Sequence, residues 1–144
     1  MTVKPHRILV PVDGSENSDR AVAYAVRLAQ AMHATEIHLL TVQPPVTGVA
    51  GALVGRASLQ SYHRDEGMKA LASALAICAL TALPHKDHIS VGQPGPTIAA
   101  FAKELGCDQI VMGTRGLGAT LGLLMGSVAT DVIKHAEVPV TLVK

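Results

Sequence analysis

The sequence predicts an α/β protein built on a doubly wound, five-stranded parallel sheet. Two features of its 144 residues support this prediction. Short apolar runs recur along the chain, as in strands that are buried on both faces. Longer amphipathic or alanine-rich stretches separate these runs, as expected of helices that connect parallel strands. The length predicts a single domain that spans residues 1–144.

The expected elements follow from apolar runs that are bounded by glycine, proline and polar residues. The expected strands are 8–12, 36–42, 88–91, 108–112 and 138–143. The expected helices are 18–31, 57–83, a segment that ends near Leu105, and 128–135. Gly106 fits the position that follows the end of a helix. Segment 44–56 carries no charge before Arg56 and is expected to be a long loop, either a lid or disordered.

The composition excludes several classes of function. Aromatic residues make up 2% of the chain and the net charge is +1, so neither base stacking nor a basic surface indicates nucleic-acid binding. No apolar run is long enough to span a bilayer, and no signal peptide is visible. Cys78 and Cys107 do not form a disulfide framework, which favours a reducing, cytoplasmic location. The seven histidines show no zinc-like spacing, so no protein metal site is expected.

A glycine-rich turn is the strongest functional signal. Gly113-Thr114-Arg115-Gly116 follows the fourth expected strand, and Gly126-Ser127 comes after nine further residues, at the start of the last expected helix. Main-chain N–H groups in such a turn can close around an anion. The motif is neither a Walker loop nor a dinucleotide fingerprint, because no Gly-Lys-Ser/Thr follows and position 121 is not glycine. It predicts a phosphate cradle, with a nucleotide as the expected cargo.

The turn after the first strand is the second expected contributor. In doubly wound sheets, ligands bind outside the carboxyl ends of the strands, where the strand order reverses. The ends of the first and fourth strands, at Asp13 and Gly113, are therefore the two expected parts of one site.

These features together resemble the universal stress protein family. The spacing Gly113-x2-Gly116-x9-Gly126-Ser127 is similar to the family's ATP-binding signature. Segments 8–15 and 138–143 resemble its first strand and turn and its last strand. The resemblance covers essentially the whole chain. It implies a Rossmann-like sheet of order 3-2-1-4-5, similar to that of the adenine nucleotide alpha hydrolases, with the first and fourth strands side by side.

The resemblance also implies a role for each residue of the site. Asp13 would bind the ribose or hold Mg²⁺ near the phosphates. The adenine pocket would be lined by Pro11, Val12 and Val42. Ribose and phosphate would approach the main chain at Gly113 and Gly116, with Arg115 as a candidate phosphate contact. The helix N-terminus would offer N–H groups from Gly126, Ser127 and Val128. The expected cofactor is ATP or another adenine nucleotide, and the expected partner is a second copy, bound through the last strand, Val138 to Val143.

Each of these residues also has a purely structural explanation. Asp13 can form an Asx-turn or cap the first helix. The glycines can serve turns that need a positive φ. Ser127 can cap the last helix, and Arg115 can simply be solvated.

Three functions therefore stay open. The first is an ATP-binding module for stress response or signalling, with no catalytic residues assigned. The second is a slow ATPase or nucleotidyl-handling enzyme, for which little catalytic machinery is in view. The third is a nucleotide-free dimeric interaction protein.

Overall fold

The computed structural model describes residues 3–115 and 125–144. Within these ranges, five parallel strands form one sheet in the order β3-β2-β1-β4-β5, which confirms the predicted fold class and strand order. The strands are β1 (His6–Pro11), β2 (Thr35–Gln43), β3 (His85–Val91), β4 (Gln109–Gly113) and β5 (Val140–Val143). The helices are α1 (Glu16–Ala31), α2 (Gly48–Leu53), α3 (Arg56–Ala79), α4 (Pro94–Glu104) and α5 (Ser127–His135).

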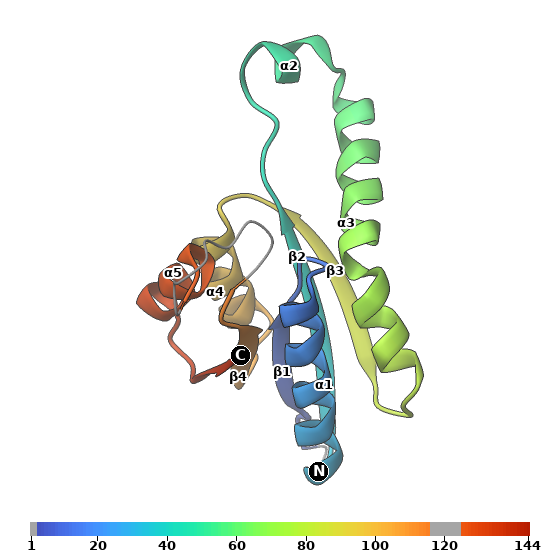
Figure 1. Ribbon diagram of the computed structural model, residues 1–144, viewed down its shortest axis with the longest axis vertical. Coiled ribbons are helices and arrows are strands. Elements are labelled where there is room, and N and C mark those ends of the chain that lie inside the picture. Colours follow the sequence, from blue (N-terminus) through green and yellow to red (C-terminus); the bar gives the residue numbers. More distant parts are fainter. Residues whose placement is uncertain (1–2, 116–124) are drawn as a thin grey trace.

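Helices cover both faces of the sheet, with α1 and α3 on one face and α4 and α5 on the other (Figure 1). Successive strand side chains point to opposite faces. Ile8 and Val10 accordingly pack in the core beneath α1 and α3, whereas Leu9 packs in the core beneath α4 and α5. Because both faces are covered, the central strands are continuous apolar runs rather than alternating ones.

The two edge strands differ from their expected lengths for separate reasons. β3 begins at His85 rather than His88, because an edge strand tolerates the exposed, charged Lys86 and Asp87 within it. β5 begins at Val140 rather than Val138. Pro139 has no N–H group for the ladder, although its carbonyl accepts a 2.9 Å hydrogen bond from the Ile110 N–H.

The segment between β2 and the middle of α3 projects from the body of the protein (Figure 1). Residues 44–66, here called the arm, include the short helix α2, where the sequence predicted a loop. Val49 and Leu53 on α2 are exposed, and so is Tyr62 on α3. Burial against the sheet begins at Gly67, and α3 ends at Ala79, before the expected Leu83.

The start of α1 brings polar side chains to the end of β1. The Ser15 hydroxyl caps the helix by accepting a 3.2 Å hydrogen bond from the Ser18 N–H, and Glu16 and Asp19 lie in the first turn, where the helix dipole favours acidic residues. Asn17 and Ser18 are buried by this arrangement. In the described part of the chain, no helix combines the length and the apolar character that crossing a bilayer requires.

Candidate functional site

The candidate site lies at the carboxyl edge of the sheet, where β1 and β4 end beside each other. The two strands pair directly, with Ile8 opposite Gln109 and Leu9 opposite Ile110. The turn after β1 and the loop after β4 therefore leave the sheet at the same edge, which is where α/β sheets of this type bind ligands.

The residues expected to line the adenine pocket lie at this edge but do not share one surface. They are Pro11, Val12 and Val42. Pro11 ends β1, and the Val12 N–H donates a 2.8 Å hydrogen bond to the Leu40 carbonyl. The Val12 side chain is 5% exposed within the core beneath α1 and α3, while Val42 packs against the core on the opposite face. A ligand at this edge would therefore meet the main chain of Val12 and the half-buried side chain of Val42.

Asp13 is held in the turn that follows β1. Its carboxylate Oδ1 accepts a 3.0 Å hydrogen bond from the Ser15 N–H, and its own N–H donates to Ser18 Oγ at 3.4 Å. The first bond is the Asx-turn that the sequence allowed. This turn orients the Asp13 side chain at the carboxyl end of β1.

Gly113 has a packing requirement that its sequence position did not reveal. A Cβ atom at this position would lie 2.7 Å from Asn17 Cγ and 3.2 Å from the Asn17 carbonyl oxygen. Such separations are shorter than any side chain could accept without displacing Asn17. Glycine is thus needed at 113 for the approach of α1, whether or not a ligand approaches the same main chain.

The two ends of the glycine-rich loop are joined by main-chain hydrogen bonds. The Gly126 N–H donates to the Thr114 carbonyl at 2.6 Å, and the Thr114 N–H donates to the Val143 carbonyl at 3.0 Å. Arg115 is exposed, and its N–H donates to Asn17 Oδ1 at 2.7 Å. Gly116 lies outside the described residues.

The N-terminus of α5 begins beside this junction. Gly126 is the N-cap residue, and no side-chain cap hydrogen bond is present there. Ser127 is the first helical residue and is exposed, so the alternative explanation that it caps the helix does not hold: the cap lies one position earlier. Val128 is 37% exposed. The first-turn N–H groups of α5, with the partial positive charge of the helix end, suit an anion.

Asn17 and Thr114 are the polar residues of the site that sequence reasoning missed. Asn17 is 8% exposed, as is Thr114, and each forms hydrogen bonds to segments distant in sequence. Asn17 stands just before the helix expected at 18–31, where a polar residue is common and carries no special signal. Across residues 3–115 and 125–144, no cluster of three or more histidine, cysteine or acidic side chains could hold a metal ion.

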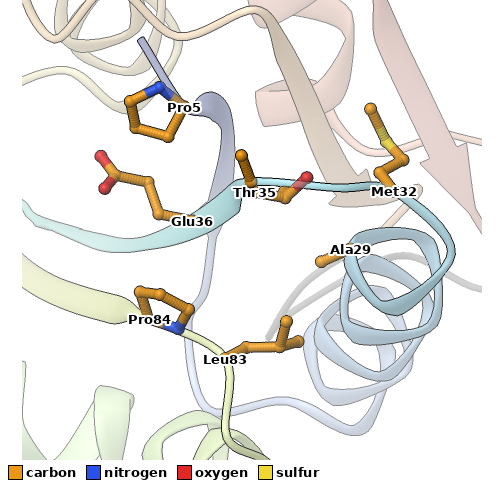
Figure 2. A pocket seen from close by; sticks show the side chains of 8 residues that line it. Pro5, Ala29, Met32, Thr35, Glu36, Leu83 and Pro84 are labelled. Carbon is orange, nitrogen blue, oxygen red and sulfur yellow. The ribbon is translucent and has the colours of Figure 1, made fainter. Parts of the chain in front are cut away.

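A pocket of about 380 Å³ lies at the opposite, amino edge of the sheet. Figure 2 shows Pro5, Glu36 and Pro84 around it, at or just before the starts of β1, β2 and β3. Glu36 is already bonded to Arg7 and His38. The hydrogen bond from His38 lowers the pKa of Glu36; burial opposes this effect and Arg7 adds to it. The predicted site residues lie at the other edge.

Comparisons with known proteins agree with the fold. The universal stress protein family model matches residues 5–144. A universal stress protein from Thermus aquaticus is 36% identical over 139 residues, which cover 95% of this chain and 97% of that protein. The structure of the universal stress protein UspA from Lactobacillus plantarum is 28% identical and has a TM-score of 0.78, covering 99% of this chain and 100% of that chain. A universal stress protein crystallised with cAMP is 25% identical, with a TM-score of 0.67 and 99% of each chain covered.

Proposed function

Because the chain belongs to the universal stress protein family, we propose that it binds an adenine nucleotide at the carboxyl edge between β1 and β4. ATP with Mg²⁺ is the proposed occupant. The N-terminus of α5 is the observation that carries this proposal. Its N-cap residue, Gly126, has no side chain that could accept the first-turn N–H groups, and the Gly126 N–H is itself hydrogen-bonded to the Thr114 carbonyl. The relative crystallised with cAMP supports an adenine nucleotide in particular.

The residues of this edge suit the parts of such a ligand. The phosphates would meet the N–H groups of Ser127 and Val128, where the helix dipole favours negative charge. Asp13 would accept hydrogen bonds from the ribose or hold Mg²⁺, which prefers carboxylate and phosphate oxygens. The base would lie near Pro11, the main chain of Val12 and the side chain of Val42. Gly113, Arg115 and Gly116 complete the proposed set.

The proposed role is a nucleotide-dependent module in stress response or signalling. A second copy would dock through segment 138–143, because β5 pairs with β4 on one side only and presents the edge of the sheet on the other. The proposed location is the cytoplasm, where the free thiols of Cys78 and Cys107 would stay reduced.

Gly126→Ser tests the phosphate cradle without disturbing the fold. Position 126 has φ −80° and ψ 167°, a backbone conformation in which serine caps helices well. A serine hydroxyl there would accept the N–H groups that the phosphates need. We expect unchanged or slightly higher stability, and an ATP affinity that falls at least about tenfold, which corresponds to about 1.4 kcal/mol. Calorimetric titration with Mg-ATP measures the affinity.

Gly55→Ser is the matched control. Gly55 is also an N-cap glycine without a side-chain cap hydrogen bond, and a Cβ atom there has no atom within 4 Å. This variant should gain similar stability and keep the wild-type ATP affinity. Equal affinities of both variants for ATP would contradict the proposed cradle.

Analysis of the supernatant after denaturing the purified protein separates the alternative functions. Retained ATP supports the binding module, and ADP formed over many turnovers supports an ATPase. No nucleotide even after soaking supports an interaction protein.

A further inference from the structure

Asn17 connects two segments that are far from it in sequence. Its Nδ2 group donates a 3.0 Å hydrogen bond to the Val143 carbonyl at the end of β5, and its Oδ1 atom accepts a 2.7 Å hydrogen bond from the Arg115 N–H. A main-chain N–H requires an acceptor and a carbonyl requires a donor, so these partners fix the orientation of the amide. Asn17 is 8% exposed, and its amide therefore has little water to turn to if either bond is lost.

The two bonds belong to a larger junction. The Val143 carbonyl also accepts the Thr114 N–H, and the Thr114 carbonyl accepts the Gly126 N–H. The hydrogen-bonded path therefore runs from the N-cap of α5 through Thr114 to Val143, then through Asn17 to Arg115. Figure 1 shows the C-terminus beside β4, where this path crosses from the loop to the edge strand. The Asn17 amide fills the space that a Cβ atom on Gly113 would occupy, with Asn17 Cγ 2.7 Å from that position.

We propose that Asn17 is a positioning residue that couples the main chain at 114–115, just after β4, to the edge strand β5. This inference rests on the proposed function, because it treats the main chain at 114–115 as part of the nucleotide site. The side-chain amide is planar and rigid, so a rotation that follows Arg115 also moves the donor that holds Val143. A ligand that draws in the main chain at 114–115 therefore changes the β5 edge. By thermodynamic linkage, a partner on β5 changes the nucleotide affinity by the same factor.

Two substitutions separate the two bonds of Asn17. Asn17→Asp keeps an acceptor for the Arg115 N–H but places a carboxylate oxygen against the Val143 carbonyl. Asn17→Ala removes both bonds. In ligand-free protein we expect the Asp variant to keep the Arg115 amide protected, while hydrogen exchange of the Thr114 amide accelerates about tenfold or more. The Ala variant should lose protection at both amides.

Ser73→Ala is the matched control. The Ser73 hydroxyl on α3 donates a 2.7 Å hydrogen bond to Asp19, which lies on α1 as Asn17 does, but this bond is not part of the junction. This variant should leave both amides as in the wild type. NMR-detected hydrogen exchange on the full chain measures all four proteins. Thr114 exchange that is unchanged in Asn17→Asp would overturn the proposal, because the Val143 carbonyl would then be held without Asn17.

Mg-ATP provides the second arm of the test. In the wild type, saturating Mg-ATP should alter the exchange of amides in 140–144. In Asn17→Ala, with Mg-ATP raised until the titration shows saturation, this response should disappear. Binding to the wild type with no response in 140–144, or an equal response in Asn17→Ala, would overturn the coupling and leave the proposed function standing. If the wild type bound none of ATP, AMP and cAMP, both the coupling and the proposed function would be overturned. The titration itself identifies that case.

Discussion

The two edges of the sheet use their polar groups in opposite ways. At the amino edge, charged side chains are paired: Arg7 Nε lies 2.7 Å from Glu36 Oε1, and Arg7 Nη1 donates to the Leu105 carbonyl at 2.7 Å. At the carboxyl edge, main-chain groups of Thr114 and Gly126 form the junction, and one neutral side chain, Asn17, completes it. Where charges already neutralise one another, a charged ligand gains little. A helix N-terminus capped by glycine still offers donors.

The comparison also shows that a pocket is a poor guide to this site. The 380 Å³ pocket lies at the amino edge, where Glu36 is turned towards Arg7 and His38. The carboxyl edge is identified instead by the direction of its main-chain groups and by the pairing of β1 with β4. A ligand held mainly by N–H groups needs orientation more than volume.

The largest expected effect is a loss of stability when Gly113, the last residue of β4, is replaced where it faces α1. Gly113→Ala places a methyl group against Asn17, and we expect a loss of about 1–3 kcal/mol in the free energy of unfolding, as for other overpacked sites. Gly126→Ala is the control, because its Cβ atom would meet nothing closer than the Thr114 carbonyl oxygen at 3.4 Å. It should lose less, chiefly through weaker capping. Urea denaturation measures both, and equal losses would contradict the packing role of Gly113.

The next largest expected effect is a loss of stability that is confined to the amino edge. Glu36→Gln removes the charge shared by Arg7 and His38, and we expect a loss of about 1–2 kcal/mol in stability, because the carboxylate is 15% exposed while Arg7 is partly solvated. Glu66→Gln, at an exposed pair with Lys69, should cost far less. Neither variant should change ATP affinity. A loss of ATP affinity in Glu36→Gln would show that the two edges are not independent.

The smallest expected effect is on the pH dependence of stability and concerns His88, in the middle of β3, opposite Leu40 of β2. His88 Nε2 lies 2.9 Å from His38 Nδ1. Burial lowers the pKa of His88 below 6.5; His38 and Lys86 lower it further, while Asp87 opposes them. The folded protein therefore binds this proton less readily than the unfolded chain. The stability linked to His88 is complete above about pH 6.5 and is lost as the pH falls through the folded pKa.

His88→Gln tests this linkage, because the glutamine amide can still donate to His38. The variant should lose less stability than the wild type between pH 7.5 and 5, with a difference on the order of 0.5 kcal/mol, since solvent screens a half-buried ring. Denaturation midpoints across this pH range measure the effect. Identical pH profiles would mean that other groups account for the acid sensitivity.

The strands could be predicted, and a candidate site could be assigned, because both depend on local patterns. The apolar run at 8–12 and the glycine spacing at 113–126 are visible without partners, and Gly106 adopts the expected positive φ of 63°. The reason for Gly113 could not be predicted, because it depends on where α1 crosses β4. Asn17 was missed for the same reason: its partners are 98 and 126 residues away.

The charged network at the amino edge was equally invisible in the sequence. Arg7 lies opposite Glu36, and His38 lies near His88, only once the pairing of β1, β2 and β3 is known. His38 is packed in the interior, at 3% exposed. Side-chain partners across a parallel sheet are set by register, and the paired strands are separated in sequence by a crossover connection.

The arm has a mechanical consequence for the rest of the molecule. α3 runs without interruption from the exposed tip to Ala70, roughly 21 Å from Arg56 at 1.5 Å per residue. There it passes over the turn after β1, where a Cβ atom on Gly14 would lie 3.5 Å from Ala70 Cα. A continuous helix bends only gently. A force applied at the tip of the arm would therefore be transmitted along α3 to its contact with Gly14, beside Asp13.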